Sequence, residues 1–214
     1  MASEQIGIVV GLRAEAKIAR KLGWDVAIGG GGADGAARAV SELIARGATA
    51  LISFGLAGGI DPSLRPGRVL VPRAVLLDGA EIPTDAALNT RLGGVTDHVI
   101  LAGDALLETA DSKRRRWRNL KVNAIDLETG AVARAALAHN LPFAVLRAIC
   151  DPANCSLPPA AKVALDQRGA IGAWRVLRSI LRSPAQVPDL LALARDAAKA
   201  RRALERRVRR LASL

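Results

Sequence analysis

The chain has 214 residues, of which half are apolar and only 2% are aromatic. A chain of this length is most simply one domain with a substantial core, and no window approaches the ~18 consecutive apolar residues of a membrane-spanning helix. The formal net charge is +11, but residues 174–214 alone hold 11 basic and 3 acidic side chains, a net +8. The basicity therefore belongs to the C-terminal segment, and the scarcity of aromatic side chains for base stacking argues against a nucleic-acid-binding protein.

Apolar patterns predict strands and helices that alternate along the chain. Strands are expected over residues 5–10, 25–28, 48–54, 69–77, 99–102 and 143–149, and the fourth is expected to continue into a hairpin. Helices are expected over residues 14–22, 34–46, 108–117 and 131–138. This alternation, with glycines where strands end, predicts an α/β fold: a three-layer α/β/α sandwich with a central mixed sheet.

Neither a metal nor a nucleotide cofactor is expected. Cys150 and Cys155 lack partner Cys or His residues at the spacing of a zinc site. Residues 30–35 satisfy the G-x-G-x-x-G pattern, but the next strand ends in Ser53-Phe54-Gly55 and offers no acidic residue to a ribose hydroxyl. We therefore expect two reduced thiols in a cytoplasmic protein, without a secretory signal, and a plain glycine-containing turn into a helix.

The segment from 122 to 151 holds the most informative polar residues. Asp126 and Glu128 stand at the entrance to a helix, and an apolar run after it stops on Asp151. Such a run is typical of a strand buried on both faces, and an Asp at its carboxyl end lies where open α/β sheets bind ligands. Two carboxyl groups directed at one crevice are suited to deliver a proton and to bind hydroxyl groups. Both functions are needed to break a sugar–base bond.

The C-terminal segment follows Pro184 and Pro188, which mark a joint. We therefore expect a catalytic domain over residues 1–183 and a basic C-terminal helix over residues 184–214. Apolar residues recur in this helix at spacings of three and four: Leu190, Leu193, Ala197, Ala200, Leu204, Val208 and Leu211. The stripe predicts an amphipathic helix that packs on the body or on a second subunit, or lies on a membrane surface.

Three blocks of the sequence resemble purine nucleoside phosphorylases and methylthioadenosine/S-adenosylhomocysteine nucleosidases. In the first block, residues 125–151, Ile125-Asp126-Leu127-Glu128 is similar to the family's [V/I]-[D/E]-M-E core, and Arg147-Ala148-Ile149-Cys150-Asp151 to its R-A-[I/V]-[S/T]-D segment. Residues 51–72 resemble its G-x-A-G-G loop with the following strand, and residues 6–16 its first strand and downstream glutamate. The resemblance implies a nucleoside phosphorylase-like fold, cleavage of an N-glycosidic bond and, commonly, a homodimer.

The resemblance also implies roles for single residues. Asp151 stands in the position of the catalytic aspartate, which would protonate or hydrogen-bond N7 of a purine. Glu128 stands in that of the glutamate that accepts both ribose hydroxyls, and Glu15 aligns with the glutamate that positions the attacking water. The further substrate contacts expected are Leu127, Asp126, Leu106, Leu107, Ala57, Gly58 and Cys150.

The nucleophile is left open between water and phosphate. A phosphate co-substrate needs a pocket of cations, hydroxyls and backbone N–H groups, for which the candidates are Gly11, Arg13, Ser53 and Gly55. Ser53, however, stands where phosphorylases have arginine, and Leu56 where both classes usually have serine. Phosphate-binding roles therefore do not transfer directly to this chain.

Within the superfamily, three features are similar to the hopanoid-associated phosphorylases, which are implicated in removing adenine from adenosylhopane. They are the GLAGGIDPSLRPG block, residues 157–161 and the basic C-terminal segment. The resemblance implies a lipid-linked adenine nucleoside as substrate and peripheral contact with the inner membrane through residues 189–214. The alternatives are a soluble nucleosidase acting on methylthioadenosine or S-adenosylhomocysteine, and a non-catalytic paralogue that binds a membrane surface or nucleic acid.

Overall fold

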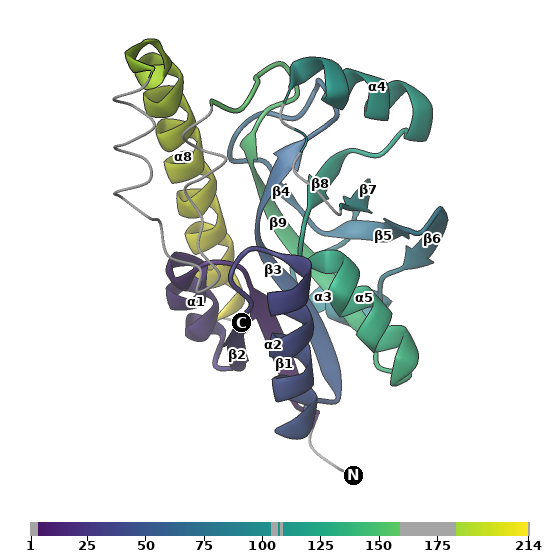
Figure 1. Ribbon diagram of the computed structural model, residues 1–214. Coiled ribbons are helices and arrows are strands. Elements are labelled where there is room, and N and C mark those ends of the chain that lie inside the picture. Colours follow the sequence, from purple (N-terminus) through teal and green to yellow (C-terminus); the bar gives the residue numbers. More distant parts are fainter. Residues whose placement is uncertain (1–3, 104–106, 108, 159–182, 214) are drawn as a thin grey trace.

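The computed structural model describes residues 4–103, 107, 109–158 and 183–213. Within them, a mixed sheet of nine strands forms the middle of the molecule (Figure 1). The strands are β1 (Ile6–Val10), β2 (Asp25–Ile28), β3 (Ala50–Gly59), β4 (Val69–Leu70), β5 (Pro72–Leu77), β6 (Ala80–Pro83), β7 (Thr96–Ala102), β8 (Ala124–Asp126) and β9 (Phe143–Asp151). Their order is β2-β1-β3-β8-β7-β5-β6, and β9 pairs with β3 and β4.

The sheet is mixed, as predicted. β3 runs parallel to β1 and β9 but antiparallel to β8, through Gly58 and Gly59 at its end. β5 and β6 form the predicted hairpin. As a result, the carboxyl ends of β1, β3 and β9 meet at one edge of the sheet, where ligands of α/β proteins bind.

Helices cover both faces of this sheet (Figure 1). One face carries α2 (Ala33–Ala45) and α5 (Thr129–Ala138), and the other carries α1 (Arg13–Ala19), α3 (Ala86–Arg91) and α8 (Val187–Leu211). Short 3₁₀ turns follow α1 and precede α8, at Arg20–Leu22 and Pro184–Gln186. α4 (Ala110–Leu120) packs through Trp117 on a third apolar cluster that includes Val99 and Ile125. The three-layer architecture confirms the predicted fold class.

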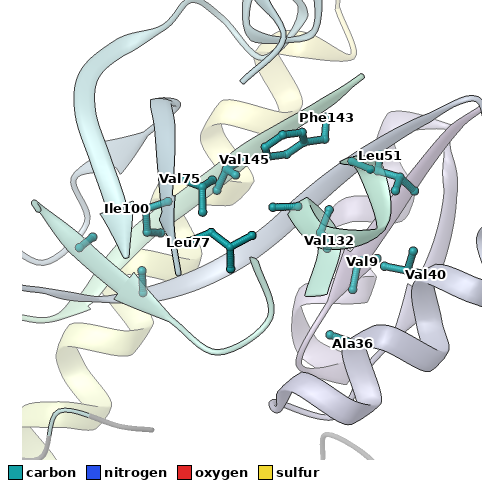
Figure 2. Close-up of a cluster of buried hydrophobic side chains, with 14 of the residues drawn as sticks. Val9, Ala36, Val40, Leu51, Val75, Leu77, Ile100, Val132, Phe143 and Val145 are labelled. Atoms are coloured by element: carbon teal, nitrogen blue, oxygen red, sulfur yellow. The ribbon is translucent and has the colours of Figure 1, made fainter. Parts of the chain in front are cut away.

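The larger core lies between the sheet and the helices α2 and α5 (Figure 2). Val9, Leu51 and Val145 of three adjacent strands face Val40 and Val132 of the two helices. Small residues let these layers come close, since a Cβ on Gly7 of β1 would lie 3.1 Å from Leu43 of α2. The low aromatic content of the sequence is thus compensated by close packing of aliphatic side chains.

The C-terminal half of the apolar stripe on α8 faces the body of the protein. Ala200, Leu204 and Val208 are fully buried in the second core cluster, among side chains of β1, β3 and β9. Arg207 also donates to the carbonyl of Leu92 at 2.8 Å. The structure therefore shows the packing on the body that was one of the predicted alternatives. Across the described ranges, no helix is both long enough and apolar enough to span a membrane.

Two described elements were not predicted. β8 has only three residues, too few for an alternating pattern to be recognised. α3 has six residues, and its start is fixed by Asp85, whose side chain accepts a hydrogen bond from the backbone N–H of Leu88. β3 also extends beyond its predicted end through a glycine-rich stretch, because this stretch pairs with both β8 and β9.

Candidate active site

Arg147 is the centre of a buried polar cluster at the carboxyl end of the sheet. Its side chain is 1% exposed, and Nη2 lies 3.0 Å from Oε2 of Glu128 and 2.7 Å from Oγ of Ser53. Its Nε lies 2.9 Å from Oδ2 of Asp126, as an ion pair without an aligned hydrogen bond. A buried guanidinium requires such partners, because an uncompensated charge would be strongly destabilising.

Asp126 fixes the chain at the start of α5. Its Oδ1 accepts the backbone N–H groups of Glu128 and Thr129 at 2.9 and 2.7 Å. Its Oδ2 accepts the hydroxyl of Thr129 and contacts Arg147. Both oxygens of this carboxylate are thus engaged by the protein, and the geometry makes Asp126 the residue that orients Glu128.

Glu128 turns one oxygen toward Arg147 and the other toward Gly11, which follows β1. A Cβ on Gly11 would lie 2.6 Å from Oε1 of Glu128, so the space for this carboxyl group exists only with glycine there. Burial raises the pKa of Glu128 to about 7, against the opposing effect of Arg147. The group therefore titrates near neutral pH, where an ionised carboxylate and a neutral acid are both accessible.

Glu15 reaches into the same cluster from α1. Its Oε2 accepts the N–H of Leu12 at 2.7 Å and its Oε1 accepts the N–H of Leu56 at 2.9 Å. A Cβ on Gly55 would lie 2.7 Å from Oε1 of Glu15 and 2.6 Å from Nη1 of Arg147. Burial raises the pKa of Glu15, while Arg147 and the N–H donors oppose this shift.

Asp151 is the last residue of β9, the strand that also carries Arg147. Gly58 of β3 pairs with Asp151 on one flank and with Ile125 on the other. Oδ2 of Asp151 accepts a hydrogen bond from Nζ of Lys113 at 2.6 Å, and both side chains are largely enclosed. Burial raises the pKa of Asp151, and the ammonium group of Lys113 opposes the shift.

The remaining predicted residues lie in three kinds of place. Ala57 and Gly58 lie on β3 beside Asp151, and Leu127 and Cys150 are half-buried next to Glu128 and Asp151 in the chain. Burial raises the pKa of Cys150 to about 12, so this thiol stays neutral. Leu107 packs on the apolar cluster under α4, whereas Leu106 lies outside the described residues.

The predicted phosphate ligands are not gathered in one place. Gly11 and Gly55 lie against the buried carboxyl groups, and Ser53 is fully buried between Arg147 and Thr129. Arg13, in contrast, is exposed and lines an open groove of about 420 Å³ between α1 and α8. In the described part of the chain, no group of three or more His, Cys, Asp or Glu side chains is arranged to hold a metal ion.

Sequence reasoning missed Arg147, Thr129 and Lys113 as members of the site. Arg147 carried a usable signal, since an arginine inside an otherwise apolar strand must find buried partners. Lys113 begins the run Lys-Arg-Arg-Arg, which is typical of a solvent-exposed helix face. Its burial depends on the position of α4 in the fold. Thr129 gave no signal beyond its place at the start of α5.

Comparison with known proteins agrees with this architecture. Residues 26–182 match the phosphorylase superfamily, and the chain belongs to this superfamily of enzymes. This confirms the superfamily and the class of enzyme that the sequence blocks predicted. Among curated proteins, no relative matches the sequence.

Solved structures share the fold over nearly the whole chain. Futalosine hydrolase of Helicobacter pylori is 18% identical with a TM-score of 0.67, covering 97% of this chain and 98% of its own. The methylthioadenosine/S-adenosylhomocysteine nucleosidase of the same organism is 17% identical with a TM-score of 0.68, covering 98% and 100%. The corresponding enzyme of Colwellia psychrerythraea, in complex with adenine, is 20% identical with a TM-score of 0.64, covering 84% and 95%.

Proposed function

We propose that the protein cleaves the N-glycosidic bond of an adenine nucleoside. The observation that carries the proposal is the pair of enclosed carboxyl groups, Glu128 and Asp151, on the two sides of the glycine-rich end of β3. Glu128 would accept the ribose hydroxyls, and Asp151 would give a proton to, or hydrogen-bond, N7 of the base. Solved neighbours that hold adenine or nucleoside analogues support this choice of substrate class.

The charge of the site favours water as the nucleophile. In the described part of the site, four carboxyl groups share two cations: Glu15, Asp126, Glu128 and Asp151 with Arg147 and Lys113. A phosphate dianion would add negative charge beside carboxyl groups whose pKa values burial has already raised. Glu15, held by two backbone N–H groups, would instead orient a water molecule for attack on the sugar.

Adenine release from methylthioadenosine and from adenosylhopane, with and without phosphate, tests the reaction. We expect release without phosphate, and no acceleration when it is added. Asp151→Asn should lower the rate by roughly 10²–10⁴-fold, the usual contribution of a positioned general acid. Unchanged turnover in this variant would contradict the proposal, and a strict requirement for phosphate would replace hydrolysis with phosphorolysis.

We further propose that the nucleoside is linked to a lipid, with adenosylhopane as the leading substrate. Support comes from the similarity of three sequence features to hopanoid-associated phosphorylases and from the basic helix α8. Release of adenine only from the lipid-linked nucleoside, presented in detergent or liposomes, is the expected result. Release from methylthioadenosine alone would make the protein a nucleosidase for small soluble substrates.

Peripheral membrane contact through residues 189–214 would be electrostatic. The C-terminal half of the apolar stripe of α8, from Ala200 to Leu211, packs on the body, so this half is not available for insertion between lipids. The outer face holds exposed basic side chains, namely Arg195, Lys199, Arg202, Arg206, Arg209 and Arg210. Binding to anionic vesicles should weaken as salt rises and with Arg206→Glu/Arg210→Glu, while equal binding to neutral and anionic vesicles would contradict it.

A further inference from the structure

Lys113 is a buried cation for which the reaction outlined so far has no use. It lies on α4, whose other basic side chains at positions 114–116 and 118 are exposed, whereas its own side chain is 1% exposed. The start of the helix is fixed by Thr109, which accepts the N–H of Ser112 at 3.1 Å. Four residues after Lys113, Trp117 packs on the apolar cluster, so the same face of the helix turns both side chains inward.

The ammonium group of Lys113 is completely coordinated. Its three N–H bonds meet Oδ2 of Asp151 at 2.6 Å, the carbonyl of Cys155 at 2.9 Å and the carbonyl of Pro152 at 3.0 Å. An ammonium group has three donors and no acceptor, so this arrangement uses every donor and fixes the position of the group. Within the described residues, Oδ1 of Asp151 has no hydrogen-bond partner.

The two oxygens of Asp151 are therefore not equivalent. Oδ2 is held by a charge-assisted hydrogen bond, the strong kind, and Oδ1 is left for a ligand. Such asymmetry is what a carboxyl group needs if it is to transfer a proton from one oxygen while the charge that appears is stabilised at the other.

We propose that Lys113 is a positioning residue that acts through Asp151 during departure of the base. The inference rests on the proposed function of Asp151 as the acid. The Oδ1–H bond breaks as an N7–H bond forms, and the electron pair of the glycosidic bond moves to the base. The carboxylate left behind is stabilised through Oδ2 by the Lys113 ammonium.

Other titratable groups face Asp151 as well. Asp196 of α8 acts on it with the opposite sign to Lys113, and the thiols of Cys150 and Cys155 are influenced by both members of the pair. Asp196 is itself paired with Lys199 at 3.1 Å. Lys113 is the cation in direct contact, so its removal should change the acidity of Asp151 most.

The test combines Lys113→Met with Asp151→Asn in a double-mutant cycle of adenine release. Lys113→Met should lower the rate by roughly 10²-fold, as loss of one preorganised donor does, and should add less than threefold in the Asp151→Asn background. The rate should fall at high pH as Asp151 loses its proton, and Asp151→Asn should abolish this fall. In Lys113→Met the fall should occur at higher pH, because loss of the cation raises the pKa of Asp151. Arg116→Met, an exposed site on the same helix, is the matched control and should leave the rate unchanged.

A substrate with a leaving group that needs no proton separates chemistry from folding. On 4-nitrophenyl riboside, Lys113→Met and Asp151→Asn should both retain the wild-type rate within threefold. Loss of this activity in Lys113→Met would mean that Lys113 only holds the structure. The same conclusion would follow if Lys113→Met lowered the rate of adenine release equally in the Asp151→Asn background, or if it left the pH dependence of the rate unchanged. If the wild type releases no adenine, the proposed function fails together with the inference. If it does and Lys113→Met is fully active, the inference alone fails.

Discussion

Two buried ion-pair systems lie near the carboxyl ends of β3 and β9, and they differ in how charge is balanced. Around Arg147, one guanidinium serves Asp126 and Glu128 and acts on Glu15 as well. At Asp151, one ammonium serves one carboxyl group, and its remaining donors bind backbone carbonyls. Burial, together with the nearby charges of Asp126 and Glu15, leaves Glu128 with a pKa of about 7. The same edge of the sheet thus holds Glu128, whose pKa lies near neutral pH, and Asp151, which is paired with a single cation.

Arg147→Met should have the largest effect on stability in this comparison. It leaves the carboxylates of Asp126 and Glu128 buried without their cation, which costs about 3–5 kcal/mol of unfolding free energy. Urea denaturation at pH 8 measures it. Arg134→Met is the matched control, because its ion pair with Asp78 is exposed and should be worth less than about 1 kcal/mol. Equal losses of unfolding free energy in Arg147→Met and Arg134→Met would show that burial does not determine how much these ion pairs stabilise the protein.

Gly55→Ala should have the next largest effect. The new Cβ would lie within 2.7 Å of both Glu15 and Arg147, and overpacking of this kind costs roughly 1–3 kcal/mol. Gly58→Ala, on the same strand, meets its nearest atom at an ordinary 3.4 Å. Thermal unfolding should therefore rank Gly55→Ala well below Gly58→Ala, and similar melting temperatures would contradict the crowding at Gly55.

The pH dependence of stability should report Glu128. Its pKa lies at about 7 in the folded protein, above the ordinary value of 4.5, so the folded state binds more protons between these values. Unfolding free energy should therefore fall as pH rises through this window and level off above it. Glu128→Gln removes this contribution, and its stability relative to the wild type should change by more than ~1 kcal/mol across the window. If the unfolding free energies of the wild type and of Glu128→Gln instead change in parallel with pH, Glu128 has an ordinary pKa.

The fold was largely predictable because its strands are long apolar runs. β1 and β9 were predicted within two residues at each end, since buried parallel strands give continuous apolar sequence, and the short edge strand β2 was predicted at its observed bounds. β8 and α3 were missed because each is short and is defined by its neighbours: β8 pairs with β3 and β7, and Asp85 fixes the first turn of α3. Such elements depend on tertiary contacts that a local pattern does not contain.

The candidate site was predictable in its acidic members and in the small residues beside them, Gly11, Ser53 and Gly55. Glu15, Glu128 and Asp151 stand beside recognisable sequence blocks, and the structure places all three at the carboxyl edge of the sheet. Their counter-ions were missed. Arg147 was counted as part of a motif, and the pairing of Lys113 with Asp151 joins residues 38 positions apart, a separation that no periodicity reports.

The burial of α8 also has a consequence for how the chain folds during synthesis. Ile8 and Val10 of the first strand share a core cluster with Leu204 and Val208, so part of one face of the sheet stays uncovered until α8 has been synthesised. Contacts of such long sequence separation slow folding, and a chain without α8 would expose apolar side chains of this cluster. Packing of α8 therefore completes this core cluster, and the basic outer face of the helix is held against the protein only once the cluster has formed.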